Sequence, residues 1–114
     1  MIEKFGMGID IIDVNRFSSK IYSKNKQFYT KIFTKNEINY CIKFKNPYIH
    51  FAGKFALKEA VIKALNKKIN LLDIETFHKN KAPYVKLKNY NNFSISSISH
   101  EKNIAVAIFL IDFS

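Results

Sequence analysis

The sequence predicts a single α+β domain over residues 1–114, in which helices pack on a mainly antiparallel sheet. Three observations support this fold class. A short apolar segment near the start has the character of a strand, the next part of the chain carries helical periodicity, and the C-terminal part consists of β-rich runs separated by turn residues. A chain of 114 residues with 47% hydrophobic residues is long enough for one core.

The first predicted strand covers residues 8–12, with the sequence GIDII. Its alternation places Ile9 and Ile11 on one face, and Asp10 and Ile12 on the other. We expect this apolar strand to be largely buried. Asp10 is therefore a carboxylate in an unexpected place.

The strand is expected to lead into a helix. Asp13 is a plausible N-cap, because its carboxylate can accept hydrogen bonds from free backbone amides of the first turn. Val14, Phe17 and Ile21 then recur at helical spacing. Basic side chains four residues apart are expected to share another face of this helix: Arg16, Lys20 and Lys24.

Two further helices are predicted. Residues 34–37, Thr-Lys-Asn-Glu, form a capping-box pattern that opens a helix extending to about residue 44, which Pro47 should end. A longer helix is expected over residues 48–65, with Asn66 near its end.

The remaining segments predict two antiparallel pairs. Residues 73–77 and 84–88 form one hairpin, and residues 93–99 and 104–111 form a second pair of strands.

Composition excludes several classes of protein. Cys41 is the single cysteine, so an internal disulfide framework and a cysteine-based zinc site are ruled out, and its apolar helical position favours a buried thiol over a reactive one. No apolar run approaches the roughly 20 residues that span a bilayer, and no segment has the layout of a signal peptide. We expect a soluble protein without a membrane partner. Its expected location is the cytoplasm, or the stroma of a plastid-like organelle if a targeting segment precedes residue 1.

The net charge of +10 favours an acidic partner, such as nucleic acid, an acidic protein or a phosphorylated metabolite. Two interpretations remain open. The lysines can serve such a partner, or they can reflect overuse of AT-rich codons, which also favours Ile and Asn. Charge alone therefore identifies no partner.

The segment FAGKFALKEAVIKAL, residues 51–65, contains the second unexpected carboxylate. On a helical wheel its alanines form a continuous stripe that suits close packing on a sheet. Glu59 and Lys63 fall beside this stripe, where Glu59 is partly desolvated. The simplest reading is an ion pair between Glu59 and Lys63, one turn apart.

Asp10 supports another reading. Two carboxylates on elements that should pack together suggest a shared cation, and Mg²⁺ is commonly held by one or two carboxylates, water and phosphate oxygens. Nearby lysines repel a metal but attract phosphate. Asp10, Glu59 and the lysines together favour a metal–phosphate site.

The motifs also resemble a known family. GMGIDIIDVNRF combines Gly-x-Gly, an aliphatic residue and Asp10, with Arg16 six residues later, and FALKEAVIK fits an aromatic-Ala-x-Lys-Glu-Ala-x-x-Lys pattern. The closing strands carry Ser97-Ile-Ser99-His100. Together, in this order and over nearly the whole chain, these segments resemble the holo-acyl-carrier-protein synthases, a group of phosphopantetheinyl transferases.

The resemblance implies the 4′-phosphopantetheinyl transferase fold and a homotrimer with sites at the subunit interfaces. It implies Mg²⁺-dependent transfer of 4′-phosphopantetheine from coenzyme A to a serine of an acidic apo-acyl carrier protein. The products are holo-carrier protein and 3′,5′-ADP, in support of fatty acid biosynthesis. Asp10 and Glu59 then bind Mg²⁺, and both belong with Lys63 to the catalytic set. The other implied roles are substrate binding by Lys54, Lys58, Ser99 and His100, and carrier docking by Arg16, Lys20 and Lys24.

The chain departs from the family pattern in several places. Lys54 replaces a usual arginine, which keeps the charge but loses bidentate phosphate binding. Residues 81–83 read Lys-Ala-Pro where Gly-x-Pro is common, and Ile104 replaces a usual aromatic residue. His100, taken without the resemblance, reads as an ordinary turn or surface histidine.

Two points stay open from the sequence. The general base for the carrier serine is either Glu59 or a metal-bound water. A small RNA-binding module is the competing class of protein, suggested by the charge and the aromatic residues, although the strand aromatics Phe77, Tyr84 and Phe93 do not form the usual aromatic-rich strand motif. A purely structural subunit would leave Asp10 and Glu59 unexplained. We expect no nucleic-acid partner.

Overall fold

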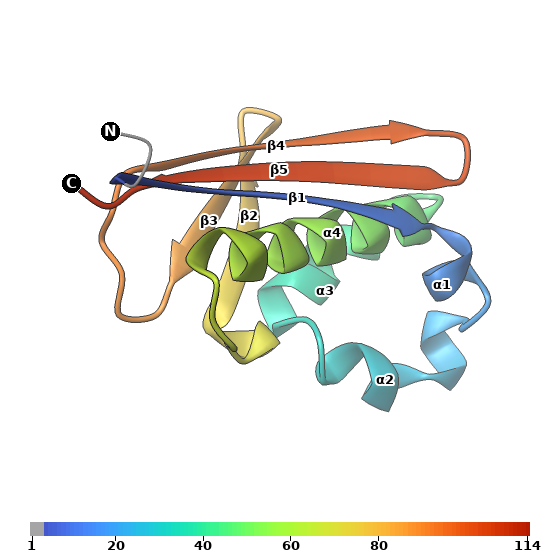
Figure 1. Cartoon of the computed structure of the whole chain (residues 1–114). Coiled ribbons are helices and arrows are strands. Elements are labelled where there is room, and N and C mark those ends of the chain that lie inside the picture. Colours follow the sequence, from blue (N-terminus) through green and yellow to red (C-terminus); the bar gives the residue numbers. More distant parts are fainter. Residues whose placement is uncertain (1–3) are drawn as a thin grey trace.

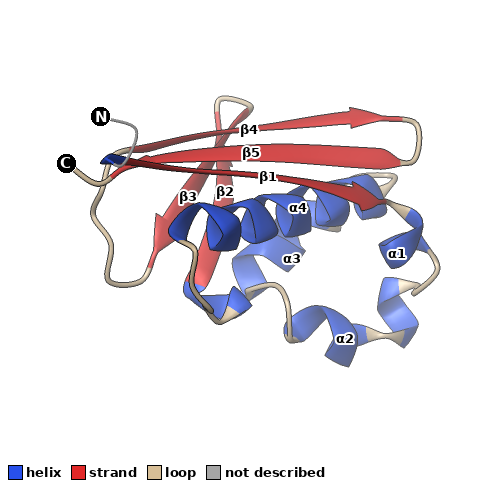
Figure 2. Ribbon diagram, viewed as in Figure 1, coloured by secondary structure: helices blue, strands red, loops and turns tan. Residues whose placement is uncertain are grey.

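The computed structural model describes residues 4–114, which form an α+β domain. Figure 1 follows its elements along the chain, and Figure 2 separates helices from strands. The elements are β1 (Phe5–Asp13), α1 (Asn15–Ser18), η2 (Tyr22–Lys24), α2 (Lys26–Thr30), α3 (Lys35–Cys41), α4 (Pro47–Leu65), η3 (Leu71–Asp73), β2 (Ile74–Lys79), β3 (Ala82–Leu87), β4 (Ser94–Glu101) and β5 (Ile104–Asp112).

The strands form two antiparallel sheets. One has the order β1-β5-β4, and the other is the β2–β3 hairpin. The long helix α4 lies along one face of the three-stranded sheet, and the shorter helices lie on the side of α4 away from that sheet (Figure 1). The predicted fold class and both predicted strand pairs are therefore confirmed.

The three-stranded sheet is buried on one face only. Cross-strand partners place Asp10, Ala107 and Ile98 in one row facing α4. On the other face, Ile9 is 57% exposed and Ile11 is 64% exposed, so the expectation of a largely buried first strand holds for one face alone. We call this other surface the open sheet face, and it includes Phe5, Met7, Ile9, Ile11, Ile95 and Ile108.

Helix α4 approaches β1 very closely, as the alanine stripe predicted. Ala52, Ala56 and Ala60 are fully buried. The partner positions on β1 are glycines: a methyl group at Gly6 would overlap the carbonyl oxygen of Ala64, and one at Gly8 would overlap that of Ala60. The small residues on both elements allow the two backbones to meet.

The ends of α4 follow from local chemistry. The Asn46 side chain accepts a hydrogen bond from the Tyr48 amide at 3.2 Å, and Pro47 occupies the first turn, where its missing N–H has no cost. Asn66 ends the helix in the left-handed conformation with φ of 52°. Pro47 therefore begins α4, and the prediction that it ends the preceding helix is wrong, because that helix already stops at Cys41.

The predicted helix after Asp13 is also shorter than expected. The Asp13 carboxylate accepts a hydrogen bond from the Asn15 amide at 2.9 Å, but Val14 is the N-cap of α1, so the prediction of Asp13 as N-cap is wrong. The helix ends at Ser18. Ile21 and Lys24 lie beyond it, with Lys24 in η2. The chain turns here because the aromatic cluster around Phe17 brings the next segments back onto α4.

The other predicted local features are present. Thr34 and Glu37 form both hydrogen bonds of a capping box at the start of α3, and Cys41 is a buried free thiol. Within residues 4–114, no helix combines the length and the apolar character needed to cross a membrane.

Candidate active site

Asp10 and Lys63 meet where β1 packs against α4. The Lys63 ammonium donates to Asp10 Oδ1 at 3.1 Å and to the Ile9 carbonyl oxygen at 2.9 Å. The Lys63 side chain is 56% exposed, whereas that of Asp10 is 14% exposed. Lys63 can turn to another anion once a cation takes its place at Asp10, because removing the partner of a largely buried carboxylate is otherwise costly.

The second oxygen of Asp10 has no partner. Asp10 Oδ2 is buried and accepts no hydrogen bond from the residues the structure describes. A buried carboxylate oxygen left in this state is costly. An unpartnered buried carboxylate oxygen is also expected where a side chain binds a cation.

Glu59 lies on α4 one turn before Lys63 and is half-buried. The simple ion pair with Lys63 is not formed, because Lys63 turns to Asp10 instead. No ion pair or hydrogen bond joins Glu59 to another described side chain. Gly8 packs at Ala60 and Gly6 at Ala64, so the strand runs antiparallel to the helix and brings Asp10 towards the turn of α4 that carries Glu59.

The described residues contain no group of three or more His, Cys, Asp or Glu side chains arranged to hold a metal ion. Asp10 and Glu59 form at most a pair. A pair suits Mg²⁺, which usually keeps several waters and takes its remaining ligands from substrate phosphates.

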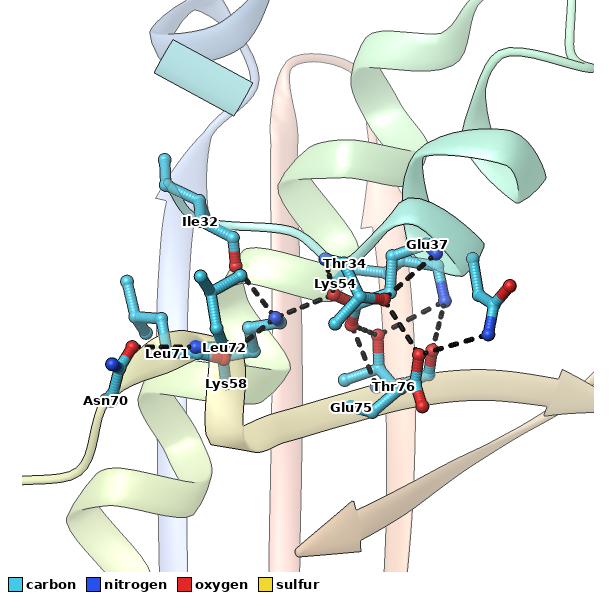
Figure 3. A network of polar contacts seen from close by, with 11 residues as sticks. Ile32, Thr34, Glu37, Lys54, Lys58, Asn70, Leu71, Leu72, Glu75 and Thr76 are labelled. Atoms are coloured by element: carbon cyan, nitrogen blue, oxygen red, sulfur yellow. Dashed lines mark hydrogen bonds and ion pairs between the residues drawn. The ribbon is translucent and has the colours of Figure 1, made fainter. Parts of the chain in front are cut away.

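Lys54 and Lys58 belong to a buried polar network between α3, α4 and β2 (Figure 3). The Lys58 ammonium is 2.7 Å from Glu37 Oε1 and donates to the carbonyl oxygens of Ile32 and Leu71. The Lys54 ammonium donates to the carbonyl and hydroxyl oxygens of Thr76. Burial lowers the pKa of both lysines, and Glu37 opposes this effect at each. Both lysines have internal partners, and their predicted contacts with a substrate remain predictions.

Glu37 is the centre of this network, although its place in the sequence predicted only a capping role. Its Oε2 accepts hydrogen bonds from the Thr76 amide and hydroxyl at 2.8 and 2.6 Å, while its Oε1 accepts from the Thr34 amide. The side chain is almost completely buried. The capping box was visible in the sequence, but the contacts with β2 and Lys58 connect residues about 20 to 40 positions apart.

The three predicted docking residues do not share one helix face, and that expectation is wrong. Arg16 lies in α1 with its guanidinium 5.0 Å from the Phe55 ring centre, and Lys20 lies beyond α1 with its ammonium 5.2 Å from the Phe28 ring centre. Lys24 belongs to η2. All three side chains are exposed, so they are accessible to an acidic partner as separate charges.

Ser99 and His100 point to opposite sides of β4. The register aligns Ser99 with Val106 and Ile11 on the open sheet face, and His100 with Ala105 and Ile12 on the face that carries α4. His100 lines a pocket of about 470 Å³ together with residues of α3, the start of α4 and the β2–β3 hairpin. Gly53 of α4 forms part of its wall.

The carboxylate pair and this pocket flank α4 on opposite sides. On the helical wheel, His50, which also lines the pocket, and Glu59 lie about 180° apart. Asp10 and His100 also belong to the two outer strands, with β5 between them. Two strand spacings amount to roughly 10 Å.

Comparison with known proteins identifies the class. Residues 6–109 match the family described as the 4′-phosphopantetheinyl transferase superfamily, so the chain belongs to this family of transferases. The particular relatives are consistent. A protein of Thermodesulfovibrio yellowstonii named holo-[acyl-carrier-protein] synthase is 46% identical over 97% of this chain and 99% of its own length.

Solved structures agree with the sequence relatives. The holo-(acyl-carrier-protein) synthase of Bacillus anthracis, described as a complex with CoA (3′,5′-ADP), is 33% identical, has a TM-score of 0.83 and covers 96% of each chain. The Helicobacter pylori synthase in complex with coenzyme A is 32% identical, with a TM-score of 0.81 over 93% of this chain and 99% of that one.

Proposed function

We propose that this protein is a holo-acyl-carrier-protein synthase. It transfers 4′-phosphopantetheine from coenzyme A to a serine of apo-acyl carrier protein, requires Mg²⁺, releases 3′,5′-ADP and supports fatty acid biosynthesis. The names of the relatives and the coenzyme complexes of two structural neighbours support the activity. The observation that carries the metal requirement is the buried, unpartnered Oδ2 of Asp10 on the strand facing the helix of Glu59.

The proposed site has the parts that phosphoryl transfer needs. Catalysis of this reaction depends on positioning and on neutralising charge at the phosphates. Mg²⁺, when bound by Asp10 and Glu59, supplies positive charge next to the coenzyme diphosphate. Lys63 adds a mobile ammonium that exchanges Asp10 for a phosphate oxygen. The serine nucleophile comes from the carrier protein, and either Glu59 or a water takes its proton.

The protein partner is proposed to be an acidic acyl carrier protein. The net charge of +10 attracts an acidic protein over a long range and raises the association rate. Arg16, Lys20 and Lys24 are exposed on the surface around α1 and η2, and we assign the docking contacts to them. The reaction is proposed to take place in the cytoplasm or in the stroma of a plastid-like organelle.

The proposed assembly is a homotrimer with its sites at the subunit interfaces. The open sheet face is largely apolar, with Ser97 and Ser99 on its β4 side, and an exposed apolar surface of this kind is typical of a protein interface. The separation of the carboxylate pair from the pocket of His100 within one chain also favours a site completed by a second copy.

One observation is relevant to the competing RNA-binding function. Phe77 and Tyr84 are exposed on the β2–β3 hairpin with ring centres 5.7 Å apart. They are direct cross-strand partners, so their stacking is explained as hairpin stabilisation. RNA affinity that falls steeply with salt, in a protein that does not respond to coenzyme A, would favour the RNA-binding alternative.

The transfer reaction can be tested directly. The protein is mixed with coenzyme A, Mg²⁺ and an apo-acyl carrier protein, and the mass of the carrier protein is measured by mass spectrometry. We expect the mass increase of phosphopantetheine, and its loss when Mg²⁺ is chelated. A folded protein that modifies no cognate carrier would overturn the proposal.

Glu59→Gln removes one proposed metal ligand while keeping the shape of the side chain. We expect at least a 100-fold loss of transfer with an unchanged circular dichroism spectrum, because removing one such electrostatic contact typically costs about 100- to 1,000-fold. Asp112→Asn is the matched control, since among the residues that the structure describes this carboxylate bonds only to Ser114 at the C-terminal end. Wild-type rates for Glu59→Gln would exclude a metal role for Glu59.

A further inference from the structure

The chain contains three histidines, and all of them line the same pocket. His50 comes from the first turn of α4, His78 from the end of β2 and His100 from the end of β4. They are more than 20 residues apart in the sequence, so only the fold brings them together. The other lining side chains include Tyr40, Phe44 and Lys81.

Aromatic contacts hold two of these imidazoles in place. The His50 ring stacks on Phe44 with centres 3.7 Å apart, and it lies 6.1 Å from the His100 ring. The His78 ring stacks parallel to Tyr40, with centres 4.7 Å apart and an angle of 1° between the planes. Stacking fixes the ring faces and leaves the ring nitrogens as the groups able to bind a ligand.

One of those nitrogens is buried without a partner. His78 Nδ1 makes no hydrogen bond to any described residue. An unsatisfied buried polar atom on a pocket wall is an expected place for a ligand contact.

Lys81 is the permanently charged side chain among the described residues that line the pocket. The Lys54 ammonium is buried, donates to Thr76, and lies 4.6 Å from the Tyr40 ring centre. Lys81 is exposed on the hairpin turn at the pocket edge. No carboxylate belongs to the described lining. The titratable and charged groups facing His78 are thus Tyr40 of α3, His50 and Lys54 of α4, Lys81 of the turn and His100 of β4.

The surroundings of His78 and His50 oppose protonation of these two imidazoles. Burial lowers the pKa of His78 to about 4, and the charges of Lys54, His50 and His100 act in the same direction. Burial also lowers the pKa of His50, again with contributions from His100 and Lys54. A bound anion would reverse this balance, because an opposite charge nearby favours the protonated imidazole.

We infer that His50 and His78, together with His100, bind the phosphomonoester of coenzyme A as imidazolium groups, so that coenzyme binding takes up protons. The inference rests on the proposed function for the identity of the ligand. Two of the three contributing residues, His50 and His78, are outside the set that the sequence predicted. Protonated His50 and His78 would supply positive charge to the pocket. The Lys54 ammonium does not supply it, because it is buried and donates to Thr76.

Proton uptake on binding determines whether the affinity for coenzyme A rises or falls with pH. The pKa values of His50 and His78 are lowered in the free protein, and we expect them to rise in the complex. Affinity is therefore greatest at low pH, and it falls as the pH rises through the pKa values of the complex. Each proton taken up makes the affinity fall by up to about tenfold per pH unit. The phosphomonoester has its second pKa near 6, so measurements above pH 7 keep the ligand charge constant.

Calorimetry provides the main test. Coenzyme A and 3′-dephospho-coenzyme A are titrated into the protein between pH 7 and 8.5, in pairs of buffers with different ionisation enthalpies. We expect net proton uptake with coenzyme A, approaching one proton for each imidazole that is neutral in the free protein, and clearly less with the dephospho compound, so the affinity ratio of the two falls with rising pH. His50→Gln with His78→Gln should remove most of this pH dependence, whereas Lys31→Gln, at an exposed lysine outside the pocket, should leave it unchanged.

Nuclear magnetic resonance tests the wild-type protein without relying on variants. With three histidines in the chain, each imidazole signal can be followed through a pH titration with and without coenzyme A. We expect the pKa values of His50 and His78 to rise on binding. Unchanged values, or binding without proton uptake, would overturn the inference while the mass-spectrometric transfer assay could still confirm the enzyme.

Coenzyme binding and carrier modification can also be separated in the opposite sense. Proton-coupled binding of coenzyme A by a protein that modifies no carrier would support the histidine pocket and overturn the proposed activity. Failure to bind coenzyme A at any pH would overturn the inference.

Discussion

At the scale of single residues, the unexpected charges of this protein divide into two groups. Glu37 and Lys58 are completely buried and satisfy one another and their backbone neighbours. Asp10 and Glu59 are only partly buried, and Asp10 retains an unpartnered oxygen. The first group stabilises the fold, and the second is left available for a ligand.

The first group gives a stability prediction. Lys58→Met leaves Glu37 as a buried carboxylate without its ion pair, and we expect the free energy of unfolding to fall by about 3–5 kcal/mol. Urea denaturation followed by circular dichroism measures the change. Adding Glu37→Gln should recover part of the loss, because both charges are then absent. Lys31→Met, at an exposed lysine, is the control and should change stability little. A double variant less stable than Lys58→Met alone would contradict the assignment of the loss to an unpaired charge.

At the scale of elements, the contact between β1 and α4 positions the candidate site. Gly6 and Gly8 allow the strand to reach the helix backbone at Ala64 and Ala60. This packing aligns Asp10 with the helix that carries Glu59 and Lys63. The distance between the carboxylates therefore depends on residues that have no functional group.

Two glycine substitutions should behave differently. Gly8→Ala places a methyl group on the Ala60 carbonyl oxygen, so we expect a loss of about 2–3 kcal/mol together with reduced transfer activity. Gly53→Ala meets only the movable side chains of Ile98 and His100, at 3.0 and 3.1 Å, and alanine favours a helix. We expect a smaller change in thermal unfolding for Gly53→Ala. Equal losses in both variants would show that the close approach of β1 and α4 is not what makes Gly8 necessary.

At the scale of the whole molecule, the open sheet face and the two separated parts of the site lead to the same expectation. An apolar surface across β1, β5 and β4 is unfavourable in water. Pairing of copies through this face would bury it.

A single substitution that introduces a charge tests the proposed trimer. Ile11→Lys places an ammonium in the open sheet face, and we expect sedimentation to show a trimer for the wild type and a folded monomer without transfer activity for the variant. Ile21→Lys is the matched control, because Ile21 is 52% exposed but lies outside the sheet. A wild-type protein that sediments as a monomer and is fully active would exclude the proposed assembly.

Much of the fold was predictable because its signals are local. The capping box at Thr34, the alanine stripe of α4 and the alternation of the C-terminal strands each depend on residues within one or two turns or along one strand. The errors came from long-range packing. The predicted helix beyond Ser18 failed because the aromatic cluster around Phe17 decided where the chain turns.

The sequence by itself determined the class of fold, the two unusual carboxylates and the family, because helical and strand periodicity and short motifs are properties of neighbouring residues. Only the tertiary structure decided which charges became structural and which stayed available. Lys58 pairs with Glu37 from another helix, Lys63 turns to Asp10, and three distant histidines share one pocket. Such pairings depend on how elements far apart in the chain pack together, and burial then sets the energy of each charge.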